Sequence, residues 1–143
     1  LEVRHHNQTI ETVTEYVDDF YKDLEKYIWG IYSEEEGLIG TVNLHNIDRC
    51  HNTAELGLMI GNKDYWGKSA SEEAISLVLD FAFDLLELNR VTGGTYSTNI
   101  GMIFTYKRLG FTREGVMRKS FLEGGNYIDG YRWGILSEEW ISG

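Results

Sequence analysis

The sequence has one cysteine, no proline and no long hydrophobic run. These absences exclude several kinds of site and of chain segment. The single cysteine, Cys50, rules out an intrachain disulfide and a multi-cysteine metal site, which favours a reducing, cytoplasmic location. Without proline, turns depend on the 16 glycines and on Asn and Asp. No apolar run approaches the roughly 20 residues of a membrane helix, and the first residues show no signal-peptide pattern. We therefore expect no membrane partner.

Positive charge is also scarce, with 13 basic against 23 acidic residues and a net charge of -10. Proteins that bind nucleic acids usually carry a basic face, so we expect no nucleic-acid partner. A cationic substrate remains compatible with this charge. The length of 143 residues, 42% of them hydrophobic, predicts one folded domain over 1–143. The chain begins at Leu1 without an initiator methionine, so we expect an incomplete N-terminus.

Apolar spacing along the chain predicts an alternation of helices and strands. The expected order is a helix over 9–28, strands at 28–32, 38–44 and 54–60, a helix after the loop 61–71, a strand at 90–97, a short helix over 100–108, and strands at 111–118 and 127–136. This order does not repeat a βαβ unit. It therefore predicts a single mixed sheet of the α/β (α+β) class.

The loop at 61–71 combines small residues with the start of a long amphipathic helix. Gly67, Ser69 and Ala70 allow the backbone to approach a ligand, and unpaired N–H groups at a helix start favour an anion such as a pyrophosphate. An ordinary strand-to-helix turn has the same composition. The stretch is not a Walker loop, because the first glycine of that pattern falls on Asn62.

A second segment, 99–111, has clear helix boundaries. Asn99 can cap the short helix at its start, and Gly110 can end it. Tyr106 lies about two turns beyond Asn99, so both side chains can point the same way. The alternative is a plain capped helix that buries Ile103, Tyr106 and Leu109.

Together the two segments resemble the GNAT superfamily of N-acetyltransferases. Its cofactor loop, Q/R-x-x-G-x-G/A, is matched by W-G-K-S-A-S at 66–71 and continued by E-E-A at 72–74. Its later motif is matched by Asn99, Met102, Tyr106, Gly110 and Phe111. The resemblance implies a mixed, mostly antiparallel, twisted sheet flanked by helices, with the family's first strand and first helix expected before Leu1.

The C-terminal part resembles one subgroup of that superfamily. E-G-V-M-R at 114–118, G-N-Y-I-D-G-Y at 125–131 and E-W at 139–140 are similar to the ribosomal-protein N-terminal acetyltransferases. Three positions depart from the family pattern, namely Ser69, Ser71 and Met102. They motivate an alternative function, a non-catalytic acyl-CoA-binding or regulatory module, beside a third possibility of a purely structural domain.

The resemblance implies acetyl-CoA as cosubstrate and no metal. The strand at 54–61 is expected to bulge and to part from the next strand, so that the coenzyme arm enters the gap. The implied cofactor-binding residues are Met59, Ile60, Gly67, Lys68, Ser69, Ala70, Ser71, Glu72, Asn99 and Tyr106.

Acetyl transfer to an amine requires a base for the ammonium proton and an acid for the departing thiolate. The resemblance assigns the acid to Tyr106. Glu55 is our candidate base, directly or through a water, and His45 and His51 are the alternatives. The acceptor stays open among a protein N-terminus, a polyamine or other small amine, and an amino sugar. We expect a monomer or a homodimer.

Overall fold

The computed structural model describes residues 2–5, 8–11, 25–60 and 69–140 of the chain. Its elements are β1 (Glu2–His5), β2 (Gln8–Glu11), β3 (Tyr27–Ser33), β4 (Gly37–Asp48), β5 (Thr53–Ile60), α1 (Ser69–Asp80), η2 (Phe81–Leu85), β6 (Arg90–Tyr96), α2 (Ile100–Leu109), β7 (Thr112–Glu123), β8 (Asn126–Leu136) and η3 (Ser137–Glu139). Here η2 is a π-helical continuation of α1, and η3 is a short 3-10 turn.

The strands form one eight-stranded sheet in the order β1-β2-β3-β4-β5-β6-β8-β7. Neighbouring strands are antiparallel except for β5 and β6, which run parallel. Short turns join β3 to β4, β4 to β5 and β7 to β8. In the β7–β8 turn, Gly124 and Gly125 have φ angles of 56° and 84°, which glycine adopts without a steric penalty. The expected mixed, mostly antiparallel fold is confirmed.

The prediction of a helix over 9–28 is wrong at both ends. Residues 8–11 are strand β2, which pairs with β3 from Gln8↔Ser33 to Glu11↔Gly30, and residues 27 and 28 already belong to β3. Residues 12–24 lie outside the described ranges. Pairing with a neighbouring strand here outweighs a local helical spacing that includes several β-branched residues.

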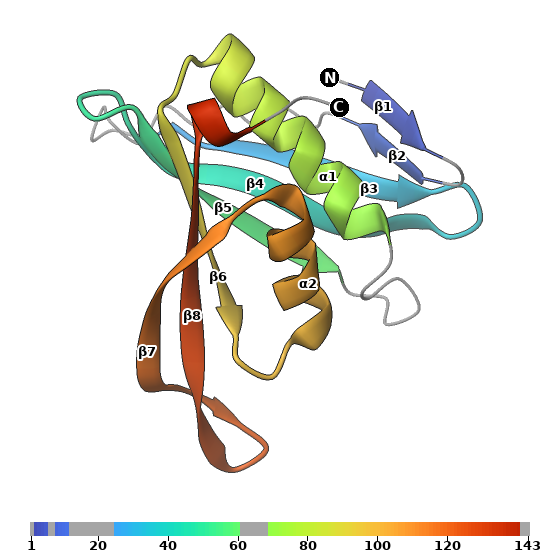
Figure 1. Cartoon of the computed structure of the whole chain (residues 1–143). Helices are drawn as coiled ribbons and strands as arrows, with labels where there is room; N and C mark the ends of the chain where they lie inside the picture. Colours follow the sequence, from blue (N-terminus) through green and yellow to red (C-terminus); the bar gives the residue numbers. More distant parts are fainter. Residues whose placement is uncertain (1, 6–7, 12–24, 61–68, 141–143) are drawn as a thin grey trace.

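Helices α1 and α2 lie on one face of the sheet (Figure 1). The core forms between them and that face, and its buried cluster includes Val78 and Leu79 of α1, Val42 and Leu44 of β4 and Ile135 of β8. Further along the sheet, Trp29 and Tyr27 of β3 pack edge-on against Phe81, with ring centroids 5.1 and 4.9 Å away. Alternation along each strand sends every second side chain to the opposite, open face.

Local signals alone set both ends of α2. Asn99 is the N-cap, and its side-chain oxygen accepts the Met102 N–H at 3.1 Å. Gly110 ends the helix in the left-handed conformation, with φ of 99°, and its N–H bonds back to Lys107 and Tyr106. Both expectations from the sequence are confirmed.

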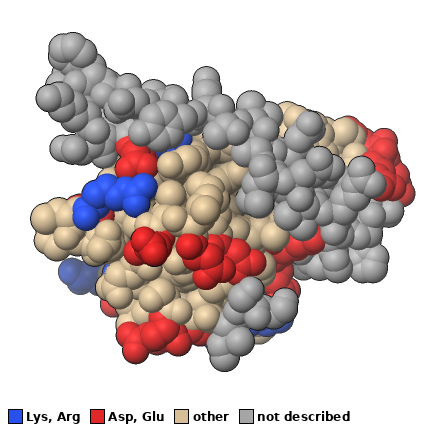
Figure 2. Space-filling model, turned by 90° about the horizontal axis from the view of Figure 1, so that it is seen from above, with Lys and Arg blue, Asp and Glu red and all other residues tan. Residues whose placement is uncertain are grey.

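Acidic side chains lie across the middle of the face seen from above, and a basic group lies at its left (Figure 2). The view shows no continuous basic stripe on the described surface of this face. Across the described ranges, no helix combines the length and the apolar character needed to cross a bilayer.

We predict that Gly110→Ala lowers the free energy of unfolding by about 1–2 kcal/mol, because alanine in the left-handed region is strained. An added Cβ would make only an ordinary contact of 3.7 Å with Ile135, so the cost is conformational. Urea denaturation followed by circular dichroism measures the change. Gly115→Ala is the control, since nothing lies within 4 Å of its Cβ position. Equal stability of the two variants would contradict the prediction.

Candidate active site

The single parallel strand pair is short, and a gap opens beyond it. β5 and β6 pair from Thr53↔Arg90 to Leu56↔Gly93. After that point β5 continues to Ile60 beside β4, while β6 continues to Tyr96 beside β8. The expected parting of the strand at 54–61 from its neighbour is therefore present. The expected bulge is not found in the described part of this strand, because pairing with β4 is regular from Glu55 to Ile60 and the register shift falls between His45 and Asp48.

Two adjoining clefts occupy this gap. One has a volume of about 460 Å³ and is lined by Leu58, Met59, Ile60, Ser71, Tyr96, Asn99 and Met102. The other has a volume of about 360 Å³ and is lined by Leu56, Gly57, Leu58, Gly94, Thr95, Tyr96, Asn99, Met102, Tyr106, Met117, Phe121 and Arg132. The clefts share four residues. They bring together five of the residues expected to bind the cofactor: Met59, Ile60, Ser71, Asn99 and Tyr106.

The start of α1 faces the larger cleft. The helix begins at Ser69, Ala70 and Ser71 are buried, and Ser71 lines the cleft. Small buried residues at a helix start leave room for an anionic group near the N–H groups. The Glu72 carboxylate instead accepts a hydrogen bond from Arg108 Nε of α2, at 3.1 Å. Gly67 and Lys68 lie outside the described residues.

Tyr106 is a buried polar residue of the smaller cleft. Its ring stacks on Trp133 with centroids 5.5 Å apart and meets Phe111 edge-on at 4.7 Å. The residue is 2% exposed, and its hydroxyl donates to the Gly94 carbonyl oxygen at 3.4 Å. Burial raises the pKa of the phenol well above its usual range, against a smaller opposing effect of Arg132. Tyr106 therefore holds its proton at neutral pH beside the smaller cleft.

Glu55 lies on the open face of the sheet, because Ala54 and Leu56 on either side of it are buried in the core. Its carboxylate accepts one hydrogen bond from Asn46 Nδ2 and another, of 3.0 Å, from Arg132 Nη2. The hydrogen bond from Asn46 and the nearby Arg132 keep the pKa of Glu55 below its ordinary value, although partial burial acts the other way. Glu55 is an ionised carboxylate at neutral pH, and its partner Arg132 lines the smaller cleft.

The two histidines considered as alternative bases lie in different places. His45 is the cross-strand partner of Glu55, is half-buried, and its Nδ1 lies 2.5 Å from Asn43 Oδ1. Burial lowers the pKa of His45, so the ring is neutral at pH 7. His51 is exposed in the β4–β5 turn, where it contacts Asp48 at 3.0 Å. That turn is at the far end of β5 from the clefts, which separates His51 from them.

Sequence reasoning missed several residues of the smaller cleft. Met117 and Phe121 reach it from β7, and Arg132 reaches it from β8. Alternation with buried Trp133 places Arg132 on the open face, and this much was visible in the sequence. The contact of Arg132 with Glu55 was not visible in the sequence, because it depends on a sheet order that brings residues 55 and 132 together.

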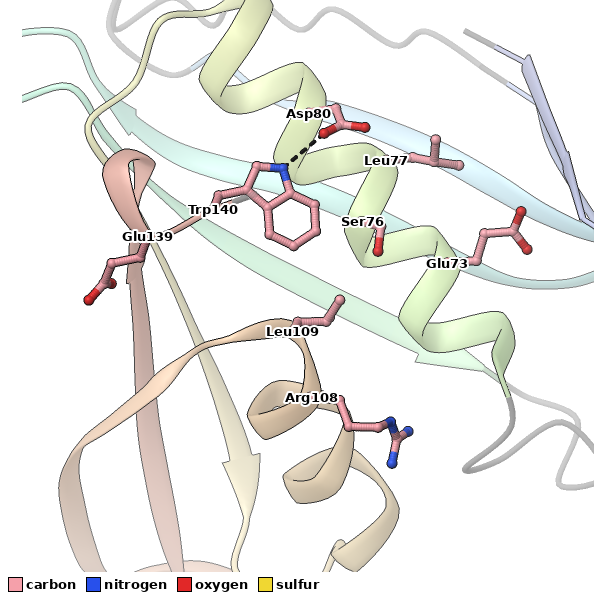
Figure 3. A pocket seen from close by; sticks show the side chains of 8 residues that line it. All are labelled: Glu73, Ser76, Leu77, Asp80, Arg108, Leu109, Glu139 and Trp140. Atoms are coloured by element: carbon pink, nitrogen blue, oxygen red, sulfur yellow. Dashed lines mark hydrogen bonds between the residues drawn. The ribbon is translucent and has the colours of Figure 1, made fainter. Parts of the chain in front are cut away.

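A third cleft, of about 540 Å³, lies between α1, α2 and the C-terminal turn (Figure 3). The Trp140 indole sits in it and donates its N–H to Asp80 of α1 at 2.8 Å. The carboxylate of Glu139 points away from it and accepts the Leu136 N–H at 2.9 Å. None of the residues that line this cleft is one expected to bind the cofactor, and the Trp140–Asp80 hydrogen bond connects the C-terminal turn to α1.

Comparison with known proteins decides the family. The acetyltransferase (GNAT) domain family matches residues 2–112. The chain belongs to this family. A relative named Probable N-acetyltransferase YjcK, from Bacillus subtilis, is 36% identical over 129 residues, which cover 89% of this chain and 70% of the relative.

Two further relatives of this GNAT chain come from Vibrio cholerae. A spermidine N(1)-acetyltransferase is 29% identical over 108 residues, covering 76% of this chain and 62% of that protein. The solved dodecameric structure of a spermidine N-acetyltransferase has a TM-score of 0.71 at 27% identity, covering 79% of this chain and 66% of that one. The chain thus spans about two thirds of the length of these relatives. Enzymes of this family use acetyl-CoA as the acetyl donor.

We predict that Gly93→Ala destabilises this GNAT chain by about 1–3 kcal/mol, because a new Cβ would collide with the phenolic oxygen of Tyr106 and lie 2.9 Å from its Cζ. The neighbouring variant Gly94→Ala is the matched control, since its Cβ would meet nothing closer than 3.7 Å. Guanidinium denaturation measures both. The prediction fails if Gly93→Ala is as stable as Gly94→Ala.

Proposed function

We propose that this GNAT chain transfers an acetyl group directly from acetyl-CoA to a primary amine. One observation carries the proposal, namely that the start of α1, Asn99 and the Tyr106 phenol all border the clefts between β5 and β6. The start of α1 suits a pyrophosphate, a narrow apolar gap suits the arm that follows it, and a protonated phenol suits the end where sulfur leaves.

The proposed cofactor contacts follow from this arrangement. Main-chain N–H groups within residues 67–72 bind the pyrophosphate, and this is supported by Ser71, which lines the larger cleft. Asn99 orients the coenzyme arm from the rim of both clefts. A main-chain N–H of Met59 or Ile60, in the wall of the larger cleft, stabilises the oxygen of the thioester carbonyl as it gains charge.

The proposed proton transfers use the two titratable groups with opposite environments. Glu55 takes the ammonium proton from the acceptor amine through a water, because its carboxylate is ionised and lies on the open face beside Arg132. The amine nitrogen attacks the thioester carbon, and the C–S bond breaks. Tyr106 then gives its proton to the departing thiolate, and burial keeps that proton on the phenol until then. The second proton of the attacking nitrogen passes through water to the phenolate, which restores Tyr106 and leaves the neutral amide.

The acceptor we propose is a small aliphatic amine of the polyamine type. Two observations support it: relatives named as spermidine N-acetyltransferases, and a net charge of -10 that attracts polycations. A protein N-terminus, which the similarity of 114–131 to ribosomal-protein acetyltransferases indicates, and an amino sugar are the competing acceptors. We keep a monomer or homodimer, a metal-free site and a cytoplasmic location as the accompanying proposals, although the Vibrio relative is a dodecamer.

A second candidate function is an acyl-CoA-binding or regulatory module without catalysis. It is favoured by Met102, which stands where the family motif has serine and which lines both clefts. Ser71, at the position of the last small residue of the cofactor loop, lines the larger one. Because a module of this kind would bind the coenzyme without turnover, binding and turnover have to be measured separately.

We predict that Tyr106→Phe slows acetyl transfer about a hundredfold or more, the usual contribution of a general acid. Phenylalanine keeps the ring contacts with Trp133 and Phe111, so affinity for acetyl-CoA should stay unchanged. Release of free CoA from acetyl-CoA with spermidine and a peptide amine, followed with a thiol reagent, gives the rate. Tyr131→Phe is the control, because Tyr131 lines neither cleft. Equal rates for Tyr106→Phe and the wild type would remove Tyr106 from the mechanism.

We also predict that CoA at 100 times its Kd raises the free energy of unfolding by about 2.7 kcal/mol, the value for a ligand that binds only the folded state. Thermal denaturation with and without CoA measures it, and adenosine diphosphate separates the pyrophosphate contacts from those of the arm. A shift with CoA but no turnover on any amine supports the binding module. No shift at millimolar CoA contradicts both functions and leaves a structural domain.

A further inference from the structure

An ion pair lies on the open face of the sheet, where β5 and β6 begin to part. Arg132 of β8 has its side chain on this face, because Trp133 next to it is buried and stacks on Tyr106 on the helix face. Glu55 of β5 shares the face, as its neighbours Ala54 and Leu56 are buried in the core. Arg132 Nη2 donates to Glu55 Oε1 at 3.0 Å.

The pair crosses a whole strand. β6 lies between β5 and β8, and Arg132 is in register with Gly94 of β6. A Cβ at position 94 would lie 3.9 Å from Arg132 Nη1, so the guanidinium passes over β6 at about van der Waals distance from this position. Glu55 is one residue before Leu56, which forms the last β5–β6 pair with Gly93. The ion pair therefore bridges the strands at the closed end of the gap.

Arg132 is also the one charged side chain among the described residues that line the two clefts. Its charge acts on the pKa of several groups around it: it lowers the pKa of Tyr106, of His45 and of Glu114 as well as that of Glu55. Arg132 thus contacts the proposed base and lines the same cleft as the proposed acid.

Both oxygens of the Glu55 carboxylate are held, one by Arg132 and the other by Asn46. A carboxylate offers about four lone-pair sites, so acceptor capacity remains for an amine or a water. With two donors fixing it, the carboxylate cannot rotate freely. The remaining lone pairs have a defined direction, and that is what a proton acceptor needs.

We propose that Arg132, which lines the smaller cleft, is a positioning residue for acetyl transfer. It fixes the Glu55 carboxylate, at the closed end of the gap between β5 and β6, in the orientation that receives the proton of the acceptor amine. This role rests on the proposed function. A purely structural ion pair is the alternative. The side chains of Arg132 and Glu55 are 41% and 30% exposed, and exposed pairs of this kind contribute little to stability, so a structural role predicts small effects throughout.

The test compares Arg132→Met and Arg132→Lys with a matched ion pair elsewhere on the same face. Arg90 of β6 pairs with Glu114, their side chains are 32% and 34% exposed, and neither residue lines the clefts. Arg90→Met therefore removes a comparable ion pair outside the proposed site. Denaturation midpoints of all variants establish that each one folds.

We expect Arg132→Met to lower kcat about tenfold, the effect of losing a hydrogen bond to a charged group, with KM for acetyl-CoA unchanged. Lysine keeps one charged donor, so Arg132→Lys should recover part of the rate. Arg90→Met should keep the rate of the wild type. The acid limb of kcat/KM should move to higher pH in Arg132→Met, because Glu55 then keeps only Asn46 as a donor and His45 as a neighbouring titratable group.

A carbon-detected NMR titration measures the pKa of the Glu55 carboxyl without turnover. The Glu55→Gln variant assigns the carboxyl signal. The proposal predicts a higher pKa of the Glu55 carboxyl in Arg132→Met and no change in Arg90→Met. Wild-type rate and pH profile in Arg132→Met overturn the positioning role and leave acetyl transfer standing. If the wild type acetylates no amine, the proposed function itself fails, and this role fails with it.

Discussion

The parting of β5 and β6 is the constraint on which the rest of the molecule depends. They are the one parallel pair of the described sheet, and parallel neighbours need a crossover connection, which here contains α1. A crossover of this kind places the start of the helix near the end of the first strand, where the strands separate after Leu56 and Gly93. Strand order therefore brings Ser71, in the first turn of α1, to the gap.

The titratable side chains near the gap differ in protonation state between the two faces of the sheet. On the helix face, Tyr106 is enclosed by Trp133 and Phe111, and burial keeps its proton in place. On the open face, Glu55 is ionised because Asn46 and Arg132 donate to it. Environments that push two pKa values apart provide an acid and a base at the same pH. The chemistry of acetyl transfer requires that pair of groups.

Sequence reasoning predicted most of the described architecture, because its signals were local. The helix between Asn99 and Gly110 follows from a cap and a left-handed glycine, and β5 follows from an apolar run. The prediction of a helix over 9–28 failed at residues 9–11, where pairing with β3 decides the structure. β7 reaches Glu123 rather than residue 118, because pairing with β8 extends to the turn. Arg132 was missed for a related reason, since a contact across three strands depends on sheet order and not on spacing.

The most direct test of the central claim is a crystal structure with CoA bound. The account predicts the pyrophosphate at the start of α1, the arm between β5 and β6, and the sulfur within hydrogen-bond reach of the Tyr106 hydroxyl. Two results would contradict this claim. The coenzyme could bind elsewhere, or its sulfur could lie far from Tyr106 while the phenol keeps its hydrogen bond to the Gly94 carbonyl oxygen.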